Sequence, residues 1–388
     1  MSKEKEVPQY QVIIDYFLKK LNDGELKPGD RIPIDAEMVK MFNVSRITVT
    51  RAIKELEHKG FIYRLKKRGS FIREKESWNN GAVNWPAREA SIGTMPIISV
   101  VLPFNEQIGY DILRGVEHIC ESEGLYVTFH NSNYNAAKEK EIIERLTNDG
   151  VHGIIIYPCS SEQNIDVFSK LMIDNYSFVI IDRNIEGLDT PLVVSDNFQG
   201  VYDLVSHLIS LKHQRIAFVS SPIKQSASVM ERYKGYCRAL IDGGIPLNQS
   251  LVSDDLIDFT ILPLEQPDLV MDSANHILEQ LMALEPRPTA IVSVNDMTAM
   301  YLIKAALQMG IAVPDELSVT GFDNLSFSEH LDVPLTTVEQ SFFAIGEQAA
   351  LLMLKKRAEP EDQIVKKTLP TKLIIRQSSS IPISQLNV

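Results

Sequence analysis

The sequence predicts an α/β protein in which a small basic head precedes a large acidic body. Two observations lead to this prediction. From about residue 96 onward, short apolar runs alternate with amphipathic helical segments, the pattern of doubly wound parallel sheets. The 388 residues also divide by charge: residues 1–75 hold 17 Lys and Arg against 11 Asp and Glu, a net charge of +6, whereas the remainder has a net charge of −18. We therefore expect a polyanion-binding module on a carrier that binds something else.

The basic head has the periodicity of three helices followed by a hairpin. Residues 10–21 carry apolar side chains at helical spacing, and a second helix is expected with Asp35 as its N-cap. Ser45 is expected to cap a third helix. Two short apolar segments, residues 61–65 and 70–72, then predict a two-stranded hairpin. This order is that of a winged helix-turn-helix, whose third helix reads the DNA major groove.

The third helix and the hairpin supply candidate DNA contacts. Arg46 can donate two hydrogen bonds to guanine, whereas hydroxyl groups and the amides of a helix N-terminus suit phosphates. The alternative is that the short polar residues only cap and solvate the helix. The candidate DNA-binding residues are Arg31, Asp35, Ser45, Arg46, Thr48, Thr50 and Arg51, with Lys66, Lys67, Arg68 and Gly69 at the hairpin tip.

The stretch "LKPGDRIPIDAEMVKMFNVSRITVTRAIKELEHKGFIYRLKKRGSF" resembles the DNA-binding domain of the GntR regulator family. The resemblance covers about residues 8–73 and includes a P-G-[DE]-x-[LI]-P stretch, a [VL]-S-R-x-T motif and a glycine in the wing. It implies sequence-specific DNA binding. Thr50 stands where an arginine is common in the family, and Lys67 replaces the first wing glycine. These departures concern the operator sequence rather than DNA binding itself.

The acidic body predicts two doubly wound α/β subdomains after a linker at residues 76–95, because ten or so strands exceed one such layer. One subdomain is expected from about 96–195 with 340–370, and the other from about 196–339 with 371–388. The expected strands are 97–102, 125–129, 153–157, 178–181, 216–220, 290–294 and 317–321. The expected helices are 111–123, 136–147, 163–174, 229–242 and 296–309, with another from about 197 to 211.

Polar residues follow several of these strands, at the sheet edge where α/β proteins bind ligands. Carboxylates, guanidinium groups and amides together donate and accept hydrogen bonds as sugar hydroxyls require, and an aromatic face suits the C–H side of a sugar. Helix capping and core packing are the alternatives for each position. The candidate effector-binding residues are Phe104, Asn105, Tyr110, Asp182, Arg183, Arg232, Asn295, Asp323 and Gln340. Two carboxylates balance two guanidinium groups, which favours an uncharged ligand.

The body, about residues 96–377, resembles the effector domain of the LacI/GalR repressors and the type I periplasmic sugar-binding proteins. Segments such as "VVSDNFQGVYDLVSHLISLKHQRIAFVSSP" and "PTAIVSVNDMTAMYLIKAALQMGIAVPDELSVTGFDN" carry the resemblance in matching order. The resemblance implies that the sugar-contacting positions are Asp182, Arg183, Arg232, Asn295, Asp323 and Gln340. A GntR-type head on such a body is the arrangement of arabinose-repressor-type regulators.

Together these features predict a repressor of sugar-utilisation genes that binds operator DNA as a homodimer and is released by a neutral sugar, with an arabinose-like pentose as the first guess. No catalytic, cofactor or metal motif occurs, and the three cysteines are too far apart for a zinc site. No membrane contact is expected, the polar N-terminus does not resemble a signal peptide, and the cysteine usage favours a reducing cytoplasm. The alternatives are a sugar receptor without DNA function, which the head opposes, and a GntR-type head on a pyridoxal-phosphate enzyme. The second would need a lysine in an aminotransferase context, which the sequence does not show.

Overall fold

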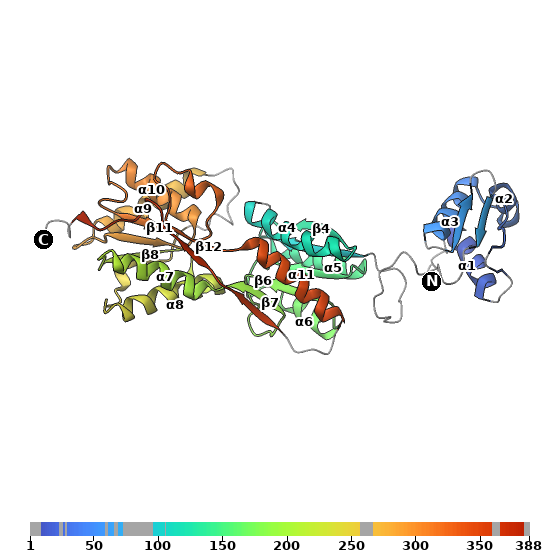
Figure 1. Cartoon of the computed structure of the whole chain (residues 1–388), viewed down its shortest axis with the longest axis horizontal. Helices are drawn as coiled ribbons and strands as arrows, with labels where there is room; N and C mark the ends of the chain where they lie inside the picture. The colour runs from blue at the N-terminus through green and yellow to red at the C-terminus, as the bar shows by residue number, and fades with distance from the viewer. Residues whose placement is uncertain are drawn as a thin grey trace, which may run out of the picture. The chain divides into compact units, whose positions relative to one another are not determined.

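The computed structural model divides the chain into two compact units, Met1–Ala87 and Arg88–Val388 (Figure 1). The predicted α/β fold class is confirmed, since a helix-turn-helix head precedes two parallel sheets with their helices. The predicted linker at 76–95 lies outside the described residues. The structure describes residues 9–22, 26–27, 29–58, 61–65, 69–72, 96–104, 106–256, 267–358 and 365–383.

The first unit is a winged helix-turn-helix with its own hydrophobic core. Its elements are α1 (Gln9–Asn22), α2 (Asp35–Phe42), α3 (Arg46–His58) and the antiparallel strands β1 (Ile62–Leu65) and β2 (Gly69–Ile72). Buried side chains come from every element and include Ile13, Phe17, Met38, Ile53, Leu56, Ile62 and Ile72. The five elements therefore bury one another.

The two predicted helix caps in the head have different outcomes. Ser45 caps α3 as predicted, because its Oγ accepts a hydrogen bond from the Thr48 backbone N–H at 3.2 Å. The prediction that Asp35 caps α2 is wrong: α2 begins at Asp35, and Ile34 is the N-cap residue. The Glu37 carboxylate instead accepts from the Ile34 N–H at 3.0 Å. A glutamate three residues after the cap can satisfy the cap backbone in this way, which places Asp35 in the first turn.

The first lobe of the second unit is a six-stranded, fully parallel sheet in the order β13-β7-β6-β5-β3-β4. Two of its elements, α11 and β13, come from near the end of the sequence. The elements are β3 (Ile97–Leu102), α4 (Gln107–Ser122), β4 (Tyr126–Asn131), α5 (Ala136–Asn148), β5 (Gly153–Ile156), α6 (Ile165–Ile173), β6 (Phe178–Ile181), β7 (Leu192–Ser195), α11 (Phe342–Ala358) and β13 (Lys366–Leu369).

The second lobe is a four-stranded parallel sheet in the order β11-β10-β8-β9, accompanied by the antiparallel pair β12 and β14. Its elements are α7 (Asn197–Ser210), β8 (Ile216–Val219), η2 (Ile223–Gln225), α8 (Ala227–Asp242), η3 (Gln249–Leu251), β9 (Val252–Ser253), α9 (Pro267–Met282), β10 (Ala290–Ser293), α10 (Asp296–Gln308), β11 (Ser318–Thr320), η4 (Ser326–Glu329), β12 (Thr337–Glu339) and β14 (Lys372–Ile374).

The described chain passes between the lobes from β7 to α7, from β12 to α11 and from β13 to β14. Figure 1 shows the red strands of the last crossing and α11 lying against the first lobe. Helices α4 and α11 approach each other backbone to backbone: a Cβ added to Gly115 would lie 2.0 Å from the Phe343 carbonyl oxygen, and one added to Gly346 would lie 2.1 Å from that of Ile112. The middle of α4 is therefore packed closely against α11.

Two histidines in the second lobe hold the C-terminal segment. His213 is 1% exposed, and its Nε2 donates to the Ser380 carbonyl oxygen at 2.9 Å while its Nδ1 lies 2.9 Å from Thr289 Oγ1. His207 Nε2 lies 3.2 Å from Ser379 Oγ. Burial lowers the pKa of His213 to about 4. The imidazole is therefore neutral at pH 7 and serves as a structural hydrogen-bonding group.

We predict that His213 makes a pH-dependent contribution to stability. A base with a lowered pKa in the folded state contributes its full stability above about pH 6.5, the unfolded pKa, and loses it as the pH falls toward 4. The free energy of unfolding of the wild type should exceed that of His213→Gln most at pH 7.5, and this excess should shrink at pH 5, by up to about 2 kcal/mol. Urea unfolding at both pH values measures it, with the exposed His276→Gln as control. An excess that is independent of pH would contradict the prediction.

Candidate functional site

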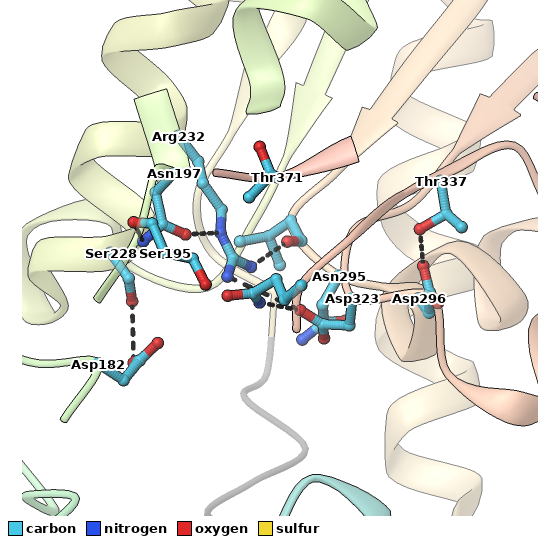
Figure 2. A network of polar contacts seen from close by, with 12 residues as sticks. Asp182, Ser195, Asn197, Ser228, Arg232, Asn295, Asp296, Asp323, Thr337 and Thr371 are labelled. Atoms are coloured by element: carbon cyan, nitrogen blue, oxygen red, sulfur yellow. Dashed lines mark hydrogen bonds and ion pairs between the residues drawn. The ribbon is translucent and has the colours of Figure 1, made fainter. Parts of the chain in front are cut away.

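The candidate effector residues gather where strands of both lobes end (Figure 2). Asp182 follows β6 in the first lobe, whereas Asn295 follows β10 and Asp323 lies just beyond β11 in the second. Gln340 lies in the crossing between β12 and α11. Parallel strands within a sheet end at the same edge, which explains why residues far apart in sequence meet here. Asp182, Asp323 and Gln340 are each less than a tenth exposed.

Arg232 of α8 is the centre of the second-lobe half of this site. Its Nε donates to Asn197 Oδ1 at 2.8 Å and its Nη1 donates to the Val294 carbonyl oxygen at 2.6 Å. Its Nη2 lies 3.7 Å from Asp323 Oδ1. The guanidinium carbon lies 3.9 Å from the centre of the Phe322 ring. Figure 2 shows Arg232 between Asn197 and Asp323, so that one 7% exposed cation joins the beginning of α7 to two strand ends.

Asp323 and Gln340 form a hydrogen-bonded pair in which one acceptor atom is not satisfied. Gln340 Nε2 donates to Asp323 Oδ1 at 2.6 Å. Gln340 Oε1 is buried and has no hydrogen-bond partner among the described residues. Burial raises the pKa of Asp323 to about 7, while Arg232 and Gln340 act in the opposite direction. The pair thus offers a carboxyl near its titration point and an unsatisfied amide oxygen, both of which a sugar hydroxyl can satisfy.

Asp182 faces the second lobe across the cleft. Ser228 Oγ of α8 donates to Asp182 Oδ2 at 3.5 Å, and a pocket of about 440 Å³ lies beside this contact. Its volume falls within the usual range of small-molecule sites. The first lobe lines the pocket with Asp182, Asn184, Leu192, Val194, Ser195 and Thr368, and the second lobe lines it with Asp196, Asn197, Phe198, Ala227, Ser228 and Glu231.

Arg183 and Phe104 belong to the wall of the first lobe. Arg183 Nη1 donates to the Cys159 carbonyl oxygen at 2.8 Å, and its guanidinium lies 5.4 Å from the Tyr157 ring centre. Phe104 packs edge-on against Tyr157 with ring centres 5.1 Å apart. Tyr157 also hydrogen-bonds Asp182, and burial raises its pKa. Tyr157, held by Phe104 and Arg183, therefore positions Asp182 from the first-lobe side of the cleft.

The remaining predicted effector residues are placed differently. The Asn295 side chain caps α10 by accepting from the Thr298 N–H at 2.8 Å. Tyr110 on α4 is 63% exposed, with the Arg114 guanidinium 5.8 Å from its ring centre. Among the described effector candidates, Asp182 alone lines the 440 Å³ pocket; Phe104, Tyr110, Arg183, Arg232, Asn295, Asp323 and Gln340 do not. Asn105 lies outside the described residues.

Sequence reasoning missed several polar residues of the site: Asn197, Ser228 and Tyr157, and in the pocket lining also Asn184, Ser195, Asp196, Glu231 and Thr368. Ser228 precedes Arg232 by four residues on α8, which is one helical turn and therefore the same face. That spacing was readable from the sequence. Asn197 begins α7 directly after a lobe crossing, and only the bond from Arg232 identifies its role.

In the head, the predicted DNA-contact residues of α3 differ in whether their side chains already make contacts within the domain. Arg46 and Arg51 are exposed, and the Arg51 guanidinium lies 4.0 Å from the centre of the Tyr10 ring. The Thr50 hydroxyl donates to the Arg46 carbonyl oxygen at 2.9 Å, and Ser45 and Thr48 Oγ atoms lie 2.8 Å apart. These hydroxyls are thus already engaged within the helix.

The other predicted DNA contacts are only partly described. Arg31 is exposed and forms an isolated bridge with Phe71 of β2, the strand that Gly69 begins. Lys66, Lys67 and Arg68 lie outside the described residues, as does the side chain of Asp35.

Family models match both parts of the chain. Residues 9–72 match the bacterial regulatory proteins of the gntR family, and residues 205–379 match the periplasmic binding protein-like domain. The chain therefore combines a GntR-type helix-turn-helix domain with a periplasmic binding protein-like domain, an architecture of DNA-binding transcription regulators.

Relatives of known class agree with this architecture. The chain is 29% identical over 383 residues to the arabinose metabolism transcriptional repressor of Geobacillus stearothermophilus, covering 97% of this chain and 99% of that protein. A LacI family transcriptional regulator from Enterococcus faecium, solved with bound ribose, is 25% identical and has a TM-score of 0.61, covering 74% and 99% of the two chains. CcpA of Lactococcus lactis shares the fold, at 21% identity over 74% of this chain and all of that one, with a TM-score of 0.64. These relatives are transcription regulators.

No helix in the described part of the chain is both long and apolar enough to cross a membrane.

Proposed function

We propose that this protein represses sugar-utilisation genes by binding operator DNA as a homodimer, and that a neutral sugar in the interlobe cleft releases the operator. An arabinose-like pentose is the first candidate. The observation that carries the proposal is the buried constellation of Arg232, Asp323 and Gln340 in one lobe, with Asp182 facing Ser228 across the cleft. Its donors and acceptors lie in both lobes, so a ligand between them favours the closed arrangement.

The charges around the pocket support a neutral ligand over a sugar phosphate. Asp182, Asp196 and Glu231 line the pocket, whereas its described lining contains no lysine or arginine. A phosphate group placed there would meet three carboxylates, and the neighbouring guanidinium groups are already engaged, Arg183 with Asp182 at 4.0 Å and Arg232 with Asn197 at 2.8 Å. A sugar hydroxyl can instead donate to a carboxylate. The arabinose candidate rests on the Geobacillus relative, and the ribose bound to the Enterococcus neighbour supports the pentose class.

The proposed dimer is supported by the number of base pairs that one DNA-binding domain can contact. A single winged helix-turn-helix contacts few base pairs, and tight operator binding ordinarily needs two half-sites related by two-fold symmetry. We propose that the effector domain provides the dimer contacts and that sugar binding changes the relation between the two heads. A regulator of this kind acts in the cytoplasm, where the operator lies.

We predict that Arg232→Ala and Asp323→Ala lose the response to sugar but keep operator binding. Each removes a charged hydrogen-bonding partner, which should weaken sugar binding by at least about tenfold because such bonds contribute roughly 1.5–3 kcal/mol. A thermal-shift panel of pentoses, hexoses and their phosphates, followed by calorimetry, measures the affinity, and operator release is measured by fluorescence anisotropy. Arg238→Ala, an exposed arginine on the same helix, is the matched control. Tight binding of a sugar phosphate without a response to any free sugar would overturn the proposal.

Sugar affinity should also increase with pH between 6 and 8. The raised pKa of Asp323 means that its carboxyl is largely protonated at pH 6, and a sugar that donates hydroxyls to the ionised carboxylate must first displace that proton. The charged groups that face Asp323 are Arg232, Asp296 and Asp182. We expect affinity to be about tenfold higher at pH 8 than at pH 6, since one pKa unit corresponds to a tenfold change. Calorimetry with Asp323→Asn should show a flat profile; an equal slope in that variant would assign the titration to another group.

In the head, we predict that Arg46→Ala removes discrimination between operator and random DNA. A bidentate contact to guanine discriminates by roughly 1–3 kcal/mol, whereas a phosphate contact weakens all sequences alike and lowers the salt slope by about one. Lys67→Ala, in the basic tip predicted from the sequence, is the comparison expected to act uniformly. Anisotropy titrations on both DNAs at several salt concentrations measure the difference. Equal losses on both DNAs for Arg46→Ala would refute its role in base recognition.

A further inference from the structure

A second polar contact joins the two lobes away from Arg232. Gln107, the first residue of α4, accepts two hydrogen bonds through Oε1 from Ser326 of η4: one from the backbone N–H at 3.0 Å and one from Oγ at 2.7 Å. The two residues are 219 positions apart. We propose that Gln107 and Ser326 form a latch that holds the lobes closed around the effector. This inference rests on the function proposed above and adds a pair of positioning residues to it.

On the second lobe, the latch shares one turn with the effector site. Ser326 follows Asp323 by three residues, and the buried carboxylate of Asp296 fixes the segment between them. Asp296 Oδ2 accepts from the Leu325 N–H at 2.8 Å and from Ser328 Oγ at 2.5 Å. The turn begins with two left-handed residues, at φ 122° for Asp323 and 53° for Asn324. Such backbone is retained only where surrounding contacts hold it.

Further bonds tie this turn to the rest of the cleft. Thr337 Oγ1 of β12 donates to Asp296 Oδ1 at 2.5 Å, as Figure 2 shows, and Arg376 Nη2 donates to Asn324 Oδ1 at 2.8 Å. Strand β12 leads directly to Gln340, the partner of Asp323. A shift of the Asp323 carboxylate is therefore transmitted to Ser326, because the turn cannot move without breaking bonds at both ends.

On the first lobe, Gln107 begins the helix next to the residues that position Asp182. Helix α4 begins shortly after Phe104, which packs against Tyr157, and Tyr157 hydrogen-bonds Asp182. The same helix packs backbone to backbone on α11 through Gly115 and Gly346. Gln107 therefore moves as a unit with the first-lobe half of the cleft, and its distance from Ser326 reports how far the lobes are closed.

The contact has the strength that a reversible latch requires. Three chain crossings connect the lobes, and the Gln107–Ser326 contact adds a further point that can fix the angle between them. Both Gln107 and Ser326 are exposed, and water competes for their hydrogen bonds in the open state. The latch therefore biases the equilibrium about five- to tenfold rather than locking it, and the effector supplies the rest of the closure.

Three variants separate the latch from general stability. Gln107→Ala removes the acceptor, Ser326→Ala leaves the backbone N–H bond, and Gln107→Glu keeps an oxygen that accepts both bonds. For L-arabinose and ribose measured by calorimetry, we expect about five- to tenfold weaker binding in Gln107→Ala, which corresponds to about 1–1.4 kcal/mol. We expect a smaller loss, about threefold, in Ser326→Ala, and wild-type affinity within about twofold in Gln107→Glu. The double variant Gln107→Ala/Ser326→Ala should be no weaker than Gln107→Ala, because the partner is already lost.

A measurement without sugar tests the latch independently of the proposed effector. Amide hydrogen exchange in residues 324–329 should be several-fold faster in Gln107→Ala than in the wild type or Gln107→Glu, while exchange in β8 stays unchanged. Unchanged exchange in residues 324–329 would overturn the latch. Faster exchange with unaltered sugar affinity would overturn its coupling to the effector. If neither sugar binds the wild type, the proposed pentose effector fails, and the exchange data still decide the latch.

Discussion

The buried guanidinium of Arg232 is the interaction on which the cleft depends. A cation removed from water must be compensated by partners with good geometry, since an uncompensated buried charge costs several kcal/mol. Arg232 finds its partners in Asn197, Val294 and Asp323, and rests on the face of Phe322. These partners lie at the beginning of α7 and after β10 and β11. Satisfying one charge therefore fixes the relative positions of three chain segments that the sequence keeps far apart.

The same requirement makes the site responsive. Arg232 and Gln340 compete for Asp323 Oδ1, and burial leaves the carboxyl close to its titration point. Gln340 Oε1 is left without a partner among the described residues. A polar cluster held in this unfinished state gains more from an arriving hydroxyl than a fully satisfied cluster would. This effect is local to the cleft, and the turn that begins at Asp323 connects the cluster to the contact with the first lobe at Ser326.

Sequence patterns identified the strands that are buried on both faces, because such strands form short apolar runs. The strands β3, β5, β6, β8 and β10 are buried and mostly apolar because helices cover both faces of a parallel sheet, and each was predicted within about a residue. The prediction did not resolve β13, whose Lys366 and Lys367 are exposed at the sheet edge and whose sequence therefore lacks an apolar run. It also did not resolve α11, which packs on both α4 and the sheet, so that its apolar residues do not form a single stripe.

For the site, residues that follow strands could be predicted because the sheet edge is a general ligand position. Asp182, Asp323 and Gln340 each follow a strand, and Arg232 joins them from helix α8. Asn197 could not be predicted as a site residue, because at the beginning of a helix it reads equally well as a capping residue. Ser228 could have been found from its four-residue spacing to Arg232 on one helix face. The Gln107–Ser326 contact could not be predicted either, since nothing in the local sequence of either residue specifies a partner 219 positions away.

The separate hydrophobic core of the head has a practical consequence for protein engineering. Ile13, Phe17, Ile53 and their neighbours are buried entirely by elements of the first unit. A domain that satisfies its own core needs no apolar surface from the rest of the chain to fold. The two units are therefore separable modules: the head can be joined to another body, and the second unit to another reader of DNA or to a reporter.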